Sequence, residues 1–481
     1  MLLLDVLKTI ASWFSPGFML GLVLVPSVIN QRKSAVSTIA WVLALLAIPY
    51  LGVLIYLTIG DSRFKRRLRR RRRAKDALGP RLAEFEGAGA CGPEELAGLP
   101  ELSRSLCQLT QAAGSFAMTR HNRVRILDGG QEKFPALMKA IEEARAHIHL
   151  EYYIFEADET GAHIRDLLTE RARQGVQVRV LWDAVGSYSV ATGFFDGLEA
   201  VGGKAASFLP LRLTRRRFEV NFRNHRKIAV IDGRVGFCGG MNIGDEYRGW
   251  NCTPWRDVHL EVEGPSVRHL QETFAEDWFF ATGEELINEA YFPAVRRPGD
   301  ELVQILISGP DQDRSSIHEV LFAAIAQARE RVLVMTPYFV PDESLLMALS
   351  TTARRGVDVR LLLPSHSDQT LALFAGRSFY EGLLEAGVRI FEHSGGILHG
   401  KVMSVDRHFA IVGTANMDER SFFLNFEVNA LLYSTAQASR IEALVREDMD
   451  RGQEITLAAF KRRPYRVRLA ENACRLLSPL L

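Results

Sequence analysis

Two stretches of this sequence carry the same set of chemically active side chains at the same spacing. Each matches the pattern H-x-K-x4-D, with His225, Lys227 and Asp232 in the first and His399, Lys401 and Asp406 in the second. Each is followed by the pattern G-[GT]-x-N. With about 6% for each charged residue type, twelve histidines give about 0.04 chance matches per chain. The two motifs are therefore a strong functional signal.

The spacing places the histidine and the lysine of each motif on one face of a strand. Both side chains can then contact one phosphate group. A lone histidine on a strand is usually a core residue, but a lysine on the same face would also need burial or a partner. Asp232 ends its strand before Gly233, which favours a hairpin turn. We expect Asp232 and Asp406 to have supporting roles in the motifs.

The segments before the motifs also occur twice, which predicts an internal repeat. EARAHIHLEYYIF followed by RQGVQVRVLWD corresponds to QARERVLVMTPYFV followed by RRGVDVRLLLP. Apolar strand runs alternate with helix-length segments, so we expect α/β repeats with sheets flanked by helices. A joint rich in proline and glycine separates the copies. The expected domains are residues 1–60, 61–120, 121–295 and 296–481.

The paired motifs resemble those of the phospholipase D superfamily. The flanking segments GFCGGMNIGDEY and GTANMDERSFFLNFEVN are similar to those of bacterial cardiolipin synthases, and the similarity extends to the N-terminal apolar region and the C-terminal tail. The one mild departure is Thr414, where serine is common. The resemblance implies that the two repeats meet at a pseudo-twofold axis and form one active site.

The resemblance also implies the chemistry. His225 would be the nucleophile that forms a phosphatidyl-histidine, because a neutral imidazole attacks an anionic phosphodiester without repulsion. His399 would act as general acid and then base, although the near-symmetry of the repeats leaves the reverse assignment open. The lysines would neutralise charge on the phosphate oxygens. No metal or other cofactor is expected.

Further site residues follow from the same resemblance. The G-[GT]-x-N segments would bind substrate through Gly240, Asn242, Thr414 and Asn416. Asp257 and Glu427 follow the two histidines by 32 and 28 residues and resemble the acids that orient the imidazoles. As isolated acids on strands, they could instead be surface residues.

Two apolar stretches near the N-terminus predict a transmembrane helical hairpin. No charged residue occurs from Thr9 to Gln31 or from Ser34 to Gly60, and each stretch exceeds the roughly 20 residues that span a bilayer. Pro16 and Pro26 leave a re-entrant first segment open. A cleaved signal peptide or a buried soluble hairpin are the alternatives.

The charge distribution predicts the orientation in the membrane. Ten of the positive charges lie between Arg63 and Lys75, so the net charge of +2 leaves −8 for the rest of the chain (2 minus 10). A basic run directly after a span favours anionic lipid headgroups and a cytoplasmic location for the catalytic domain. The expected cellular location is thus the inner (plasma) membrane, with several membrane spans and the catalytic domain on the cytoplasmic side. Five cysteines without a metal-ligand spacing fit a reducing compartment.

The resemblance implies a cardiolipin synthase that acts on phosphatidylglycerol, and the apolar stretches and the basic run favour lipid over nucleic acid. A hydrolase of the phospholipase D or nuclease type is the alternative, since water can attack the same intermediate. A scaffold with a dead site is disfavoured by the complete motifs. The C-terminal segment KRRPYRVRLAENACRLLSPLL predicts either an interfacial membrane helix or a helix docked on the second repeat. The sequence leaves the oligomeric state open, a homo-oligomer included.

Overall fold

The computed structural model describes residues 16–30, 35–48, 50–56, 79, 81, 89–209, 222–249, 254–312 and 314–478. They form two compact units. The first holds helices α2 to α4, and the second holds every described element from α6 onward. The basic run from Arg63 to Lys75, on which the predicted membrane orientation depends, lies outside the described residues.

The first unit is a small helical cluster. It consists of α2 (Pro16–Ile29), α3 (Ala35–Ala47) and α4 (Leu51–Ile55). Val28, Leu45, Val53 and Tyr56 form its buried centre, and the Tyr56 hydroxyl donates to Ser27 Oγ at 3.2 Å. Most of its other large side chains are both apolar and exposed. Within the described ranges, no helix combines the length and apolar character needed to cross a bilayer.

The second unit contains the two predicted repeats. Among the elements with described bounds, α6 (Pro93–Ala97) and α7 (Glu101–Ala112) precede them. The first repeat contains, in chain order, β1 (Thr119–Asp128), α8 (Gly130–Glu143), β2 (His147–Tyr152), α9 (Glu159–Arg173), β3 (Gln177–Asp183), α10 (Asp196–Ala200), β4 (Lys204–Phe208), β5 (Arg223–Asn224), β6 (Lys227–Ile231), β7 (Val235–Gly239), α11 (Asp245–Arg248), β8 (Val258–Glu263) and α12 (Val267–Thr282).

The second repeat follows the same plan with additional helices. It contains β9 (Glu301–Ser308), α13 (Ser316–Gln327), β10 (Arg331–Met335), β11 (Phe339–Val340), α14 (Glu343–Arg354), β12 (Asp358–Pro364), α15 (Thr370–Arg377), α16 (Tyr380–Glu385), β13 (Arg389–His393), β14 (Val402–Val405), β15 (Phe409–Gly413), β16 (Met417–Asp418), α17 (Glu419–Phe423), β17 (Asn425–Leu432), α18 (Thr435–Asp450), β18 (Gln453–Ile455), α19 (Leu457–Lys461) and α20 (Tyr465–Arg475).

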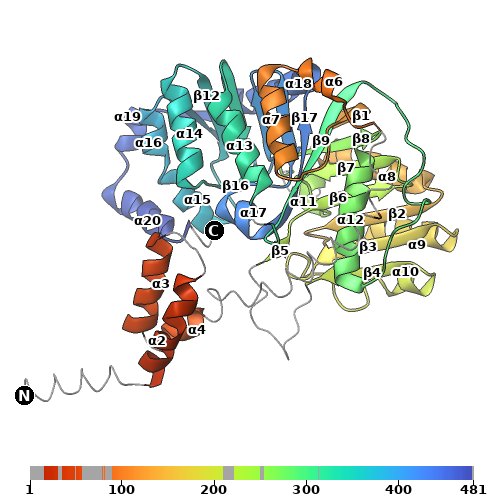
Figure 1. The fold of residues 1–481 in the computed structure, drawn as a ribbon, viewed down its shortest axis with the longest axis horizontal. Helices are drawn as coiled ribbons and strands as arrows, with labels where there is room; N and C mark the ends of the chain where they lie inside the picture. The colour runs from red at the N-terminus through yellow and green to blue at the C-terminus, as the bar shows by residue number, and fades with distance from the viewer. Residues whose placement is uncertain are drawn as a thin grey trace, which may run out of the picture. The chain divides into compact units, whose positions relative to one another are not determined.

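The strand order shows how the repeats are related. Within the described residues one continuous sheet runs β18-β13-β12-β10-β14-β15-β17-β9-β1-β8-β7-β6-β2-β3-β4. From the β1–β9 junction outward, both halves have the same order: β1-β8-β7-β6-β2-β3-β4 on one side and β9-β17-β15-β14-β10-β12-β13 on the other. The predicted pair of mixed α/β repeats is therefore confirmed, and Figure 1 shows the two halves side by side.

The sheet is covered by helices that bury their apolar faces on it. Leu137, Ile141 and Ile164 of α8 and α9 lie in the core of the first repeat, and α13 and α14 contribute to that of the second. α7 precedes the first repeat in sequence but packs on α13 of the second, as Figure 1 shows by its orange colour among the later helices. This contact attaches the segment before the first repeat to the second repeat.

The strands of the motifs run in a defined direction through this sheet. β6 begins at Lys227 and ends at Ile231, and β14 runs from Val402 to Val405. We call the end of the sheet that carries His225 and His399 the site end, and the opposite end, which carries Asp232 and Asp406, the turn end. The C-terminal ends of β2, β3, β10 and β12 also lie at the site end, according to their registers.

Candidate active site

Each motif enters the sheet beside a segment of the other repeat. β5, which immediately precedes His225, pairs in parallel with the start of β17, and His225 N donates to Phe426 O at 2.9 Å. In the same way, His399 N and Gly400 N donate to Arg256 O at 2.7 and 3.0 Å. These reciprocal backbone contacts bring the two histidines to one place although 174 residues separate them in the chain (399 minus 225).

The side chain of His225 is held by an acid of the second repeat. Its Nδ1 lies 2.9 and 3.0 Å from the two carboxylate oxygens of Glu427, which is fully buried. Thr414 Oγ1 donates to the same carboxylate. A carboxylate only accepts hydrogen bonds, so Nδ1 carries the hydrogen and Nε2 keeps a free lone pair. This is the tautomer that a nucleophilic imidazole requires.

The side chain of His399 is held by an acid of the first repeat. Its Nδ1 lies 2.7 Å from Asp257 Oδ2, and Asp257 is fully buried. Gly240 makes this possible, because a Cβ at that position would overlap the Asp257 carboxylate. Gly240 and Thr414 occupy equivalent places in their motifs. Both were expected to bind substrate, and the structure places both against the acids that hold the imidazoles.

The two lysines stand beside the histidines in the same buried space. Lys227 Nζ donates to His225 O at 2.8 Å, and Lys401 Nζ lies 3.0 Å from His399 Nδ1. Both are at least 96% buried. Burial lowers the pKa of Lys401 to about 8 and that of Lys227 well below its ordinary value. The nearby acids raise both pKa values, but by less than burial lowers them.

Burial also determines the charge of the imidazoles. It lowers the pKa of His225 and of His399 to about 4, with the lysines acting in the same direction and the paired acids opposing it. Burial disfavours the charge of Glu427 as well, but His225 and Lys227 outweigh it and lower the pKa of that carboxyl group. At neutral pH the free site therefore holds neutral imidazoles beside an ionised Glu427.

The two asparagines of the motifs are placed differently from each other. Both polar side-chain atoms of Asn242 are hydrogen-bonded. Its Oδ1 accepts from Ile154 N at 3.2 Å, and its Nδ2 donates to the Tyr247 hydroxyl at 2.9 Å. Asn416 is also buried, but its Oδ1 has no hydrogen-bond partner. The second asparagine is thus freer to turn toward a bound phosphate group than the first.

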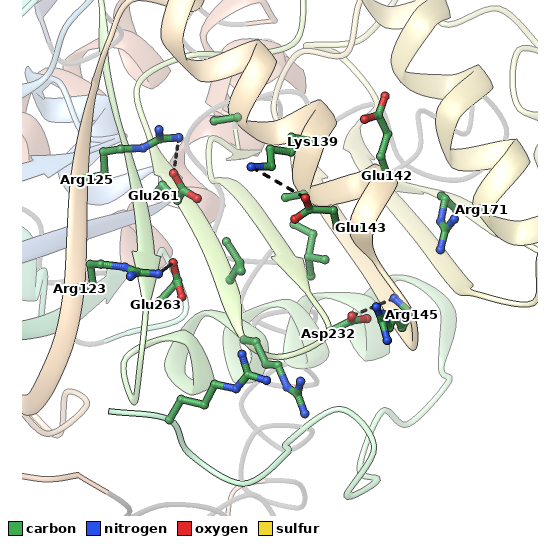
Figure 2. Close-up of a pocket in the computed structure, with 16 residues that line it drawn as sticks. Arg123, Arg125, Lys139, Glu142, Glu143, Arg145, Arg171, Asp232, Glu261 and Glu263 are labelled. Carbon is green, nitrogen blue, oxygen red and sulfur yellow. Dashed lines mark hydrogen bonds and ion pairs between the residues drawn. The ribbon is translucent and has the colours of Figure 1, made fainter. Parts of the chain in front are cut away.

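The structure does not bring the motif aspartates to the site. Asp232 accepts hydrogen bonds at 2.7 to 2.9 Å from the backbone N–H groups of residues 145–147, and Asp406 accepts three from residues 329–331. Figure 2 shows Asp232 beside Arg145 in a charged groove at the turn end. The five-residue strand β6, roughly 16 Å long, lies between it and His225. These aspartates fix the turn and the start of the neighbouring strand.

Two residues near the histidines were not predicted from the sequence. The Tyr247 hydroxyl lies 3.3 Å from His399 Nδ1, and Lys133 Nζ donates to Asn242 O at 3.0 Å. Burial lowers the pKa of Lys133 to about 7. A comparison of the two repeats could have drawn attention to Tyr247. It lies five residues after Asn242, and the equivalent position of the second copy is occupied by Ser421. The two halves of the site therefore differ behind their imidazoles.

A third group of residues lies at the mouth of the site. Tyr153 packs edge-on against His225 with ring centroids 4.9 Å apart, and Trp255 lies 5.2 Å from His399. The Tyr338 hydroxyl donates to Asp368 at 2.8 Å, and the Tyr338 ring lies 6.4 Å from that of His399. Two imidazoles, two lysines and two orienting acids thus form a site suited to displacement at a phosphodiester.

Comparison with known proteins gives consistent matches over most of the chain. Residues 137–278 and 321–449 match the family model described as cardiolipin synthase, PLD-like domain, and residues 20–60 match that of the phospholipase D-nuclease N-terminal region. A cardiolipin synthase of Geobacillus thermodenitrificans is 43% identical over 458 residues, which cover 94% of this chain and 90% of that protein. Cardiolipin synthase 2 of Bacillus cereus is 39% identical over 470 residues, covering 97% and 90%.

A solved structure supports the same architecture. The crystal structure of a phosphatidylserine synthase of Haemophilus influenzae has a TM-score of 0.61 to this chain, at 15% identity. The match covers 78% of this chain and all of the other. At this level of identity the likeness concerns the fold alone.

Proposed function

This chain belongs to the cardiolipin synthase family of phospholipase D-like proteins, and we propose that it forms cardiolipin from two molecules of phosphatidylglycerol with release of glycerol. The observation that carries the proposal is the crossed pairing of His225 with Glu427 and of His399 with Asp257. It provides two oriented imidazoles in one buried site, which a two-step transfer requires.

In the first step His225 acts as the nucleophile. Its Nε2 attacks the phosphorus of one phosphatidylglycerol, and the bond from phosphorus to the headgroup glycerol oxygen breaks. Glycerol is a poor leaving group as an alkoxide, so His399 donates a proton to that oxygen. The products are free glycerol and a phosphatidyl group bound to His225 through a P–N bond.

In the second step the acceptor lipid takes the phosphatidyl group. The headgroup hydroxyl of a second phosphatidylglycerol loses its proton to His399, and its oxygen attacks the phosphorus. The P–N bond breaks, which releases cardiolipin and restores His225. Lys227 and Lys401 stabilise the negative charge on the phosphate oxygens in both steps, and Asn416 donates a hydrogen bond to them. The step needs no cofactor, since one ester bond is exchanged for another.

The substrates are bilayer lipids, so the enzyme should be attached to the membrane. We place the attachment in the N-terminal apolar stretches as a hairpin through the plasma membrane, with the catalytic repeats in the cytoplasm. The match of residues 20–60 to an N-terminal family model and the exposed apolar side chains of α2 and α3 support this placement. Attachment confines donor and acceptor to one plane and favours the lipid alcohol over water.

The function is tested by the stoichiometry of products. The purified protein is incubated with vesicles of phosphatidylglycerol that carries a labelled headgroup, in the presence of a chelator. One free glycerol is expected for each cardiolipin, and excess glycerol should drive the reaction backwards because the bond energies nearly balance. Phosphatidic acid as the main product would instead identify a hydrolase. A strict requirement for a cytidine-activated lipid would exclude phosphatidylglycerol as the donor.

The topology is tested separately in intact cells. Cysteines introduced near residues 100 and 300 are expected to react with a membrane-impermeant reagent only after the cells are permeabilised. Labelling from outside would place the repeats on the other face and contradict the charge argument.

A further inference from the structure

We propose that the site end of the second unit is a docking surface for an anionic phospholipid bilayer, and that the outer face of α20 forms the edge of this surface. The inference rests on the proposed function, because it concerns how the same active site reaches lipid. It goes beyond the N-terminal attachment, which keeps the protein near the membrane but does not determine which face of the catalytic unit contacts lipid.

Several exposed apolar side chains of the second unit lie near the active site, whereas Phe322 and Met347 are exposed on α13 and α14. Tyr188 follows β3, Leu371 lies at the start of α15 after β12, and Phe423 ends α17 just before β17. Each of these positions is at the site end. Tyr188 is 84% exposed and Phe423 48%. Large apolar side chains left in water at one end of a domain are typical of a surface that contacts lipid or another molecule.

The helix α20 has two different faces. On its inner side Glu471 is buried and pairs with Arg377 at 3.4 Å and Arg463 at 3.2 Å, which docks the helix on the second repeat. On the outer side Tyr465, Leu469 and Leu476 share one face and are all more than half exposed. The helix is therefore docked on the second repeat, as one of the two predictions for this segment has it, and it presents an apolar stripe outward.

The position of α20 connects this stripe to the active site. α20 packs against α15, and α15 follows the loop that carries Asp368. Asp368 accepts the hydrogen bond of Tyr338, whose ring faces His399. A bilayer that covers α20 would thus reach the mouth of the site, and a lipid headgroup would have a short path to the histidines.

Charge identifies the bilayer as the occupant. The segment from Lys461 to Arg475 has five basic residues besides Arg463, which is paired with Glu471, and that glutamate is its one acidic residue. Two of the five, Lys461 and Arg468, pair with Glu385 and Glu381 of α16. Glu471 itself is buried, so the exposed part of the segment is positively charged. Apolar side chains next to exposed arginines match the interface of a membrane that contains anionic lipids. A symmetric contact with a second copy would place the same basic segment close to itself.

The turn end has the opposite character. Figure 2 shows a groove lined by charged side chains, in which Arg123 pairs with Glu263, Arg125 with Glu261, and Lys139 with Glu143. Placing these ion pairs in lipid would cost far more than leaving them in water. The contrast between the two ends gives the catalytic unit a preferred orientation, with the site end toward the bilayer.

The contact is tested with the full-length protein in vesicles of phosphatidylcholine and phosphatidylglycerol. An environment-sensitive fluorescent amino acid is incorporated at Leu469 or, as a matched control at the turn end, at Glu142. Lipids with a nitroxide on the acyl chain are expected to quench the fluorophore at 469 and leave the one at 142 unchanged. Equal quenching at both positions, or quenching at 142 alone, would overturn the orientation.

A kinetic test uses two matched pairs of substitutions. Arg462→Gln with Arg466→Gln and Arg145→Gln with Arg234→Gln change the charge equally, at the α20 edge and at the turn end. The first pair, and likewise Leu469→Gln with Leu476→Gln, should lower the rate on phosphatidylglycerol vesicles about tenfold while leaving the rate on monomeric dihexanoyl phosphatidylglycerol unchanged. The pair at the turn end should alter neither. An equal loss on both substrates would contradict the proposal.

The outcomes separate this inference from the proposed function. Quenching at 469 needs no turnover, so it can succeed even if the parent protein fails to make cardiolipin. Quenching by a second, labelled copy of the protein instead of by lipid would show that another chain covers α20. That result would replace the bilayer as the occupant.

Discussion

His225 hydrogen-bonds Glu427, a carboxylate 202 residues further along the chain and in the other repeat. His399 pairs with Asp257 in the reverse sense, across 142 residues. Neither repeat can therefore orient its own imidazole. The active site is therefore complete only when the two halves are held together, as they are here in one continuous sheet through β1 and β9.

The crossed pairing predicts the effect of removing either acid. Glu427→Gln and Asp257→Asn should each lower kcat by roughly 10²–10⁴-fold, because an amide no longer fixes the tautomer of the paired imidazole. Initial rates of cardiolipin formation measure the loss. Glu454→Gln, which changes an exposed acid paired with Arg389, should have no comparable effect. A loss of less than tenfold in both acid variants would contradict the orienting role.

The two histidines should have different roles, and only His225 should carry a covalent lipid adduct. His225→Ala and His399→Ala should each abolish transfer and leave the circular dichroism spectrum unchanged, because each imidazole has a role that the other cannot take. Rapid acid quenching of the unmodified enzyme should trap a lipid adduct on His225, detectable by mass spectrometry. An adduct on His399 would reverse the assignment. Normal turnover in either variant would exclude a shared site.

Tyr247 should support His399 and not His225. Its hydroxyl lies 3.3 Å from His399 Nδ1, and burial raises its pKa well above the ordinary value, so it stays protonated. Tyr247→Phe should slow transfer about tenfold with phosphatidylglycerol but much less with a p-nitrophenyl phosphodiester, whose leaving group needs no proton. Equal slowing with both substrates would indicate a general structural defect instead.

Gly240 should tolerate no side chain. Gly240→Ala places a methyl group against the Asp257 carboxylate and should lower activity at least about 100-fold by displacing His399. Gly382→Ala is the matched control, because a Cβ there meets no atom within 4 Å and the position lies in helix α16. The comparison is made with kcat and with the thermal midpoint of unfolding. Full activity of Gly240→Ala would show that Asp257 can be displaced without cost.

Binding of a phosphodiester anion should take up protons. In the free site the pKa of both imidazoles is about 4 and that of Lys401 about 8, so the imidazoles are neutral at pH 7. A bound anion stabilises the cationic forms and raises these pKa values. Affinity should therefore weaken as pH rises, by the linkage between proton uptake and binding. The uptake would also supply the proton that His399 donates.

Calorimetry measures this uptake. A phosphonate analogue of phosphatidylglycerol is titrated into the enzyme at pH 7 in buffers of different ionisation enthalpy, with a neutral diacylglycerol of the same chain length as control. The phosphonate should take up between a few tenths of a proton and one proton, and the control none. Proton release on binding of the phosphonate would contradict the neutral imidazoles.

The sequence alone determined the chemistry and the repeat. The H-x-K-x4-D spacing and the duplicated strand patterns are local features, so the two α/β repeats, the histidines and the lysines were all identifiable from the order of the residues. The turn after Asp232 was also local: residues 232 and 233 both adopt positive φ, as a tight hairpin turn requires.

Only the tertiary structure decided which acid pairs with which histidine. Asp257 and Glu427 were candidates by resemblance, but their spacing after the histidines gives no sign that each serves the opposite repeat. That pairing depends on the parallel contact of β5 with β17 and on its counterpart between Arg256 and Leu398, which are long-range backbone contacts without a sequence signature. The motif aspartates, Gly240 and Thr414 were identified as motif residues, but only packing showed which backbone groups and which acids they contact. Spacing along a strand is local, whereas what a buried polar group contacts depends on which distant segment closes over it.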